Sequence, residues 1–274
     1  MTTIIDKPIT TAPTTLTPPV RAVSVRDAVT QSFTMGYRGL LKIRHNPEQL
    51  FDVVLQPIIF TLMFTYIFGG AIAGNIHDYL PIIIPGILVQ TVIVTSIVTG
   101  TQLREDMDKG VFDRFRSLPI ARISPLAGAL LADVVRYLIA TTITFVVGIA
   151  MGWRPDALGV LGATLLVIVC SFAVSWIFAL MGTLMKKASA VQGVSMLILF
   201  PLTFMSNAFV PPGTMPGWMQ AFVKVNPVSH LVTAVRELTS NGHVGVHVLW
   251  SLIGAAVIIA IFAPLTVKSY MRNA

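Results

Sequence analysis

Long apolar blocks separated by short polar segments fill most of the chain after residue 50. The uncharged blocks at 53–73 and 79–102 are long enough to cross a bilayer, because a helix needs about 20 apolar residues to span roughly 30 Å of hydrocarbon. Strands of a membrane barrel would alternate in polarity over about ten residues, and these blocks are continuous. We therefore predict an all-α polytopic membrane protein with six transmembrane helices, at 53–73, 79–102, 125–151, 157–185, 188–210 and 248–267.

A different pattern precedes the first block. Residues 1–23 are rich in Thr and Pro without an apolar stripe, which predicts a disordered cytoplasmic tail. Over 24–45, apolar residues such as Val25, Val29 and Phe33 recur at helical spacing, with basic residues on the flank. This pattern predicts an amphipathic helix in the membrane interface, either a simple anchor or a mechanical element. Residues 46–274 are then expected to form a single transmembrane domain.

Composition and charge narrow the class of protein. Of the 274 residues, 54% are hydrophobic and 11% are charged, whereas a soluble globular protein carries roughly 25% charged residues. An ordinary soluble enzyme is therefore excluded, and the single cysteine, Cys170, excludes an internal disulfide. The net charge of +7 does not point to nucleic acid, because the basic residues lie on juxtamembrane loops next to anionic lipid.

The basic residues also predict the orientation. With the N-terminus inside, fifteen of the 19 Lys and Arg residues fall on the cytoplasmic side, three fall outside, and Arg136 lies within a span. Because cytoplasmic loops are enriched in Lys and Arg, we expect both termini in the cytoplasm.

The cytoplasmic segment 103–124, between the second and third spans, is far more charged than a connection requires. It holds nine of the 31 charged residues, although helix–helix connections need only a few residues. Its apolar residues Val111, Phe112 and Phe115 recur at helical spacing, and Pro119 ends the pattern. Such a short helix suits docking in a groove of a partner protein; a solvated or lipid-lying loop is the alternative. The candidate docking residues are Arg104, Glu105, Asp106, Asp108, Gly110, Val111, Phe112, Asp113, Arg114, Phe115, Arg116 and Pro119.

Three segments carry recognisable motifs. They are NPEQLFD, QPIIF and FGGAI within 46–72, DMDKGVFDRFRSLP at 106–119, and FP, SNAFVP and NPVSH within 200–230. Together they resemble the ABC-2 type permeases, and more narrowly the permease subunits of daunorubicin/doxorubicin-resistance exporters. The second motif resembles that family's acidic-x-x-Gly-Thr-Leu-Glu-Arg segment and departs from it at Val111 and Asp113, where Thr and Glu are usual.

The resemblance implies six spans with both ends inside, an N-terminal elbow helix and a coupling helix in the first cytoplasmic loop. It also implies short re-entrant external helices between spans 5 and 6, where the Pro-rich segment 211–247 is too broken to span. The candidate residues there are Pro211, Trp218, Asn226, Pro227 and His230. The implied function is a bacterial plasma-membrane exporter of a hydrophobic or amphipathic compound such as a drug or antibiotic; a lipid or envelope glycopolymer is the alternative cargo.

The energy source is expected on another chain. A phosphate-binding loop needs Gly-x4-Gly-Lys-Ser/Thr, and this sequence contains no Gly-Lys dipeptide. We therefore expect no catalytic residue and no cofactor in this permease, and ATP with Mg on a separate ABC ATPase subunit present in two copies. A second permease, either an identical copy or a paralogue, is the other expected protein partner.

Ionisable residues inside the spans are scarce. Asp133 and Arg136 are three apart and can face each other on one helix, as a self-neutralising pair, a coupling element or a substrate contact. An ion-coupled secondary transporter, the alternative from another class, would need several buried carboxylates, and only Asp133 qualifies.

Two further patterns, a pair of histidines and a row of phenylalanines, have more than one interpretation. His243 and His247 have the i, i+4 spacing of metal ligands, but adjacent glycines weaken a helix there and no third ligand is evident, so we expect no metal site. Phe60, Phe64 and Phe68 share one face of the first span. Core packing, contact with lipid and stacking on a drug are the alternative explanations for this face.

Overall fold

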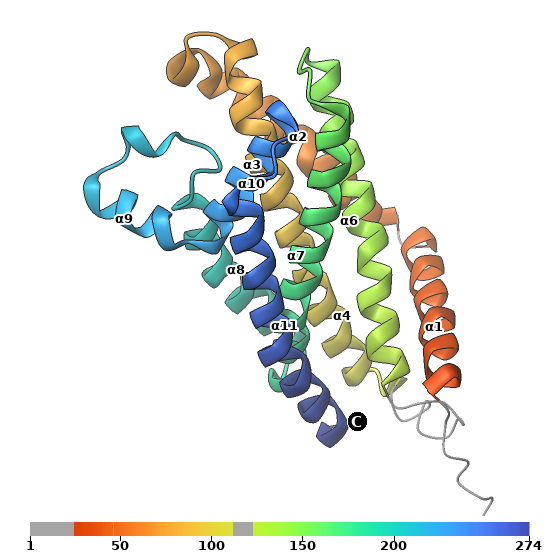
Figure 1. Cartoon of the computed structure of the whole chain (residues 1–274). Helices are drawn as coiled ribbons and strands as arrows, with labels where there is room; N and C mark the ends of the chain where they lie inside the picture. The colour runs from red at the N-terminus through yellow and green to blue at the C-terminus, as the bar shows by residue number, and fades with distance from the viewer. Residues whose placement is uncertain (1–24, 46, 112–122, 274) are drawn as a thin grey trace, which may run out of the picture.

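The computed structural model describes residues 25–45, 47–111 and 123–273, and its regular elements are all helices (Figure 1). This confirms the prediction of an all-α protein. The long helices lie side by side in a tilted bundle. The elements are α1 (Val25–His45), α2 (Pro47–Ala73), α3 (Ile76–Thr95), α4 (Ile97–Asp108), α6 (Ser124–Ala150), α7 (Ala157–Leu184), α8 (Ala188–Phe204), a 3-10 turn η1 (Pro212–Thr214), α9 (Gly217–Val225), α10 (Pro227–Asn241) and α11 (Val246–Asn273). The predicted tail, residues 1–23, lies outside the described residues.

Five helical segments of the described chain are long and apolar enough to cross a membrane. They are Val53–Ala73, Ile76–Asp108, Ser124–Ala150, Ala157–Leu184 and Val246–Arg272. The segment expected as a span at 188–210 is helical only as far as Phe204 and is shorter than the others. Its helix gives way to a turn in which the Ser206 hydroxyl donates to the Thr203 carbonyl at 2.6 Å.

Helix α3 is the centre of the bundle. Its side chains are buried around the whole circumference, including Tyr79, Leu80, Ile83 and Ile87. A helix that is hydrophobic on every side is typical of such a buried position. Helix α11 is the opposite case, because it exposes a broad apolar face that includes Trp250, as expected of a helix in contact with lipid.

The second predicted span differs from its expected shape in two ways. It is divided at Ser96, which separates α3 from α4 although its own backbone stays right-handed helical, with φ −63° and ψ −21°, and it continues past residue 102 to Asp108. Arg104, placed in the loop by the sequence, is thus on a helix. Ion pairs at i, i+4 spacing, Arg104–Asp108 and Glu105–Lys109, stabilise this extension.

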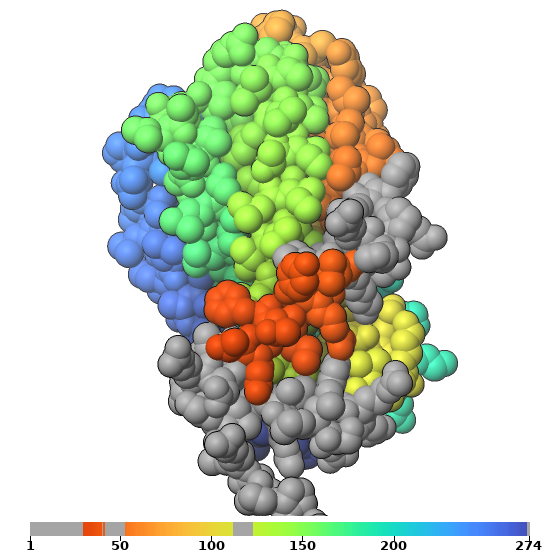
Figure 2. Space-filling view, turned by 90° about the vertical axis from the view of Figure 1, so that its right-hand side faces the viewer, coloured from red at the N-terminus to blue at the C-terminus, as the bar shows by residue number. Residues whose placement is uncertain are grey.

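Helix α1 packs against α6 through small residues. A Cβ atom built on Gly39 would approach the Cβ of Ala132 to 2.8 Å, and Gly36 and Gly128 form a similarly close contact nearby. On the outer side of α1, Phe33 and Tyr37 are exposed. Figure 2 shows α1 lying over the lower part of α6.

The two ends of the bundle are distinct. The α2–α3 and α6–α7 turns lie at the upper end of Figure 1, whereas α1 and the end of α11 lie at the lower end. Near the upper end, the Asp156 amide donates to the Thr239 carbonyl at 2.8 Å and so joins the start of α7 to α10.

Candidate functional site

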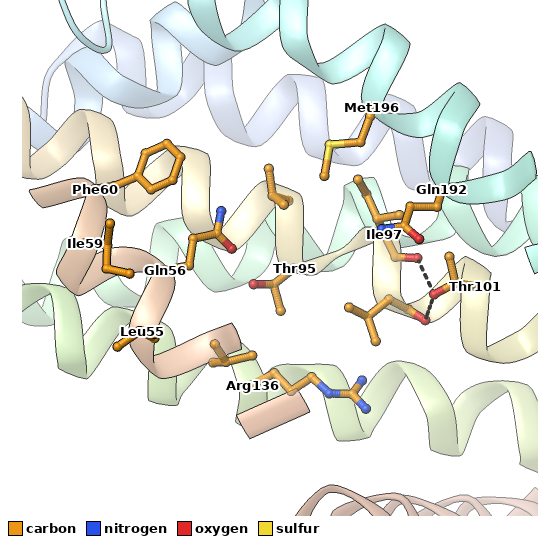
Figure 3. Close-up of a pocket in the computed structure, with 13 residues that line it drawn as sticks. Leu55, Gln56, Ile59, Phe60, Thr95, Ile97, Thr101, Arg136, Gln192 and Met196 are labelled. Carbon is orange, nitrogen blue, oxygen red and sulfur yellow. Dashed lines mark hydrogen bonds between the residues drawn. The ribbon is translucent and has the colours of Figure 1, made fainter. Parts of the chain in front are cut away.

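A cavity of about 470 Å³ lies between α2, α3, α4, α6 and α8 (Figure 3). Phe60 lies at one end of it and Thr101 at the other. Most of its lining is aliphatic, and a few polar side chains interrupt that surface, namely Gln56, Thr95, Thr101, Arg136 and Gln192. A mostly apolar cavity of this size with a few polar groups is typical of small-molecule sites.

Two amide side chains face the cavity. Gln56 comes from α2 and Gln192 from α8, and neither side chain makes a hydrogen bond within the described residues. The Thr101 hydroxyl, by contrast, donates to the Val98 carbonyl at 3.1 Å. Because an amide offers both a donor and an acceptor, Gln56 and Gln192 can bond polar groups of a bound molecule.

The Asp133–Arg136 pair is buried beside this cavity. Arg136 Nη1 donates to one carboxylate oxygen of Asp133, and the hydroxyl of Thr99 donates to the other. Arg136 Nη2 donates to Gln102 Oε1 at 3.0 Å, which links α6 to α4. The i, i+3 spacing predicted the pair. Sequence reasoning missed Thr99 and Gln102, although they have the same i, i+3 spacing on the second span.

A second polar group lies at the break between α3 and α4. The Tyr137 hydroxyl donates to Ser96 Oγ at 3.0 Å, and Ser96 Oγ donates to the Ser171 carbonyl at 3.2 Å. Tyr137 is fully buried. These bonds join α6 and α7 to the point where the central helix is interrupted, and no signal in the sequence marked Tyr137.

The candidate docking residues are described only in part. Arg104 Nη1 donates to the Met185 carbonyl at 3.1 Å, which ties the end of α4 to the link between α7 and α8. Glu105, Asp106 and Asp108 continue α4, and Gly110 follows it with a left-handed φ of 64°, a conformation that favours glycine after a helix. Val111 is the last described residue before the gap. The candidate residues that lie outside the described residues are Phe112, Asp113, Arg114, Phe115, Arg116 and Pro119.

The candidate external residues lie on and around α9 and α10. Asn226 caps α10, since its Oδ1 accepts from the Val228 amide at 2.9 Å, and its Nδ2 donates to the Leu202 carbonyl at 2.7 Å. Pro227 occupies the first turn of α10, where a missing N–H costs little. His230 Nδ1 lies 3.0 Å from His247 Nδ1.

The other two candidates do not join this group. Pro211 precedes η1, and Trp218 on α9 is 64% exposed. The structure does not gather all five candidates into one site, and a functional role of this segment stays a prediction.

Arg236 on α10 is a connecting residue that sequence reasoning missed. Its Nη2 donates to the Ile82 carbonyl at 2.9 Å and to the Asn207 carbonyl at 3.1 Å, so it holds α10 to α3 and to the segment after α8. Burial lowers the pKa of Arg236 to about 10, which leaves the guanidinium charged at neutral pH. A lone Arg on an amphipathic external helix was the only signal in the sequence.

Comparison with known proteins gives the family. The profile described as ABC-2 type transporter matches residues 30–239. The chain is 46% identical, over 252 residues, to the daunorubicin resistance ABC transporter permease protein DrrB1 of Streptomyces coeruleorubidus, covering 90% of this chain and 87% of that protein. It is 25% identical over 276 residues to the probable doxorubicin resistance ABC transporter permease protein DrrC of Mycobacterium tuberculosis, covering 99% of each.

These matches agree with the motifs quoted from the sequence and with the bundle of apolar helices. They confirm the resemblance to permease subunits of drug-resistance exporters. With a family match over most of its length and a relative that is 46% identical, the chain belongs to the ABC-2 type transporter family.

Proposed function

We propose that this chain is the permease subunit of an ATP-driven exporter that moves a hydrophobic or amphipathic compound of drug size out across a bacterial plasma membrane. The observation that carries the proposal is the cavity between α2, α3, α4, α6 and α8. Its aliphatic wall suits an apolar body, and the amides of Gln56 and Gln192 suit polar substituents. The named relatives, which are permeases of daunorubicin and doxorubicin resistance, support a drug-like cargo.

In this proposal α8 and the turn after it form the fifth of six crossings along the chain, in addition to the five long apolar segments, and both termini are cytoplasmic. Two contacts support this. Just before α8, the Met185 carbonyl accepts a hydrogen bond from Arg104 at the end of α4. Just after α8, the Asn207 carbonyl accepts one from Arg236, and the same side chain also donates to the Ile82 carbonyl on α3. Arg104 and Ile82 are about 22 helical residues apart along α3 and α4, roughly 33 Å, which is the thickness of a bilayer core.

The driving force enters from the cytoplasmic side. We place the coupling helix at residues 111–118, in contact with a separate ABC ATPase subunit, and expect two permeases to pair with two ATPase subunits. Helix α4 connects that region to the cavity, because it carries Gln102 and Thr99 of the buried network as well as Thr101 of the cavity wall. A push on the end of α4 would therefore displace the cavity wall, with the break at Ser96 as the point of bending.

The test is transport by the reconstituted complex. The chain would be co-expressed with its ABC ATPase, purified, and placed in vesicles with the ATPase face outward and doxorubicin outside. We expect doxorubicin to accumulate inside only when ATP and Mg²⁺ are supplied. Accumulation driven by a proton or sodium gradient without ATP would instead favour an ion-coupled transporter, and no movement of doxorubicin or lipid under either condition would refute an exporter.

A further inference from the structure

Two histidines from separate helices meet where α10 packs against α11. His230 is the fourth residue of α10, and His247 is the second residue of α11. Their Nδ1 atoms lie 3.0 Å apart, and the two rings are stacked with centroids 5.2 Å apart and planes at 28°. The spacing in the sequence linked His247 with His243, but the structure pairs it with His230. These two side chains are here called the histidine pair.

The contact in the histidine pair depends on how many protons the two rings hold. A hydrogen bond between two imidazole nitrogens needs a protonated nitrogen on one ring and an unprotonated nitrogen on the other. Two neutral rings meet this condition, and so does a neutral ring beside a charged one. Two charged rings do not, because both Nδ1 atoms are then donors and both rings are positive. Histidine ordinarily changes its charge between pH 5 and 8, so acid breaks this bond.

The surroundings of the histidine pair do not compensate a second positive charge. Both rings are half-buried, so that protons reach them from the medium, and neither ring forms an ion pair within the described residues. Both also lie near a helix N-terminus, where the helix dipole opposes positive charge. Glu237, the carboxylate of α10, is seven residues from His230 and packs against Gly245.

Other ionisable groups on the helices packed against α10 and α11 do not bond to either ring within the described residues. These groups are His77, Asp78 and Tyr79 on α3, Cys170 on α7, Lys224 on α9, Arg236 on α10, Lys268, Tyr270 and Arg272 on α11, and Asp156 and His243 in the links before α7 and α11. Helix α8 has no ionisable residue. Tyr79, for example, donates its hydroxyl to the Phe209 carbonyl at 2.8 Å. Protonation of both rings therefore leaves two positive charges facing each other.

Helix α10 connects several parts of the bundle, so its contact with α11 has effects beyond the two rings. Arg236 bonds it to α3, and the Thr239 carbonyl bonds it to the start of α7. Thr233 Oγ1 accepts from Asn207 Nδ2, in the segment after α8, at 2.8 Å. Helix α11 runs from α10 to the lower end of the bundle (Figure 1). The histidine pair thus joins α11 to a helix that already holds three others together.

We propose that the histidine pair is a proton-sensitive latch between α10 and α11, which is closed at neutral pH and opens when the medium outside the membrane becomes acidic. Opening releases the start of α11 from α10, loosens this end of the bundle and slows export. The inference rests on the proposed function for the outward orientation of α10, and it adds regulation to that function.

The first test measures thermal unfolding of the purified chain in detergent at about pH 7.5 and about pH 5. The unfolded chain binds more protons in acid than the paired rings do, so the latch stabilises the folded chain less as the pH falls. His247→Asn places an amide where Nδ1 was, and this amide bonds to His230 at either pH. Between the two pH values, the unchanged chain is expected to lose about 2–4 °C more of its midpoint than this variant, as one hydrogen bond allows.

Two further variants control this measurement. His230→Asn is the reciprocal change and is expected to reduce the loss in the same way as His247→Asn. His243→Asn also removes one titrating ring, but His243 is exposed and lies outside the pair, so the full loss should remain. Equal losses in the unchanged chain and in both variants of the pair would overturn the latch.

The second test measures transport by the permease–ATPase complex in vesicles with the ATPase face outward, so that α10 faces the lumen. The lumen is buffered at about pH 7.5 or about pH 5.5, and doxorubicin uptake without ATP is subtracted because a weak base also collects passively in an acidic lumen. The acidic lumen is expected to slow ATP-driven uptake by the unchanged complex about two- to tenfold, as the loss of one hydrogen bond allows. Uptake by the His247→Asn complex should slow less than about twofold.

Failure of the latch and failure of the proposed function give different results. Equal slowing of the unchanged and His247→Asn complexes by the acidic lumen, or slowing of neither, would refute the latch and leave the exporter intact. A complex that moves neither doxorubicin nor lipid with ATP at neutral pH would refute the exporter and, with it, the regulation of export.

Discussion

Arg136 is held inside a span by partners on two helices. It pairs with Asp133 one turn away and with Gln102 on α4, while Thr99 takes the second oxygen of Asp133. Both charges are removed from solvent, with 3% and 0% of each residue exposed. A charge of this kind is tolerated only while its partner is present, because an unpaired buried ion costs several kcal/mol.

We predict that removing either charge alone destabilises the protein more than removing both. Asp133→Leu leaves Arg136 unpaired and is expected to lower the free energy of unfolding by about 3–5 kcal/mol. The double variant Asp133→Leu/Arg136→Met should recover most of that loss, since no charge remains buried. Denaturation of the purified variants in detergent measures both effects, and additive losses would show that the two charges do not act as a pair.

At the scale of elements, glycines determine how closely α4 and α7 approach. A Cβ built on Gly100 would collide with the carbonyl of Phe178, and one built on Gly182 would collide with the carbonyl of Gly100. Inside a bilayer, helices associate through close van der Waals contact rather than through the hydrophobic effect, and small residues permit that contact. This contact lies next to Thr99 and Thr101, so it also fixes one wall of the cavity.

Substitution at this contact should therefore destabilise the bundle. Gly182→Ala is expected to cost about 1–3 kcal/mol, because the added methyl group forces the two backbones apart. Gly254→Ala in α11 is the matched control, since nothing lies within 4 Å of its added Cβ, and alanine there is expected to be neutral or to stabilise by up to about 1 kcal/mol. Thermal unfolding in detergent would compare them, and equal midpoints would contradict the close-contact argument.

At the scale of the whole molecule, one helix connects the proposed docking segment with the cavity. The end of α4 leads to the proposed docking segment, and its start lies at Ser96, where bonds from Tyr137 and to Ser171 join α6 and α7. Between these ends it carries Thr99, Thr101 and Gln102 of the network and the cavity. Movement of the Asp108 end of α4 would thus reach the cavity without an intervening loop.

We predict that the proposed docking segment, residues 111–118, binds the ATPase subunit. The combined change Phe112→Asp, Phe115→Asp and Arg116→Glu removes the apolar surface and reverses a charge, and is expected to reduce co-purification of the ATPase at least about tenfold and to abolish export. Lys224→Glu, at the end of α9, is a control charge reversal that should leave both unchanged. Normal co-purification and export by the triple variant would refute the coupling role of this segment.

The sequence alone was enough to predict the all-α architecture and the approximate limits of the long apolar helices. The reason is local, because a backbone in hydrocarbon must satisfy its hydrogen bonds within its own segment, and the length of an apolar block then determines whether it spans. Spacing on one helix predicted the Asp133–Arg136 pair in the same way. The motifs at 46–72, 106–119 and 200–230 were likewise sufficient for the family.

The tertiary structure decided what depends on contacts between helices. The break at Ser96, the short α8, the partners Thr99 and Gln102 of the buried pair, and the stacking of Phe64 on Phe209 could not be read from the order of residues. Arg136 and Gln102 are 34 positions apart, and Tyr79 and the Phe209 carbonyl are 130 apart. Periodicity within one helix specifies which residues share a face, but only packing specifies which face of another helix they meet.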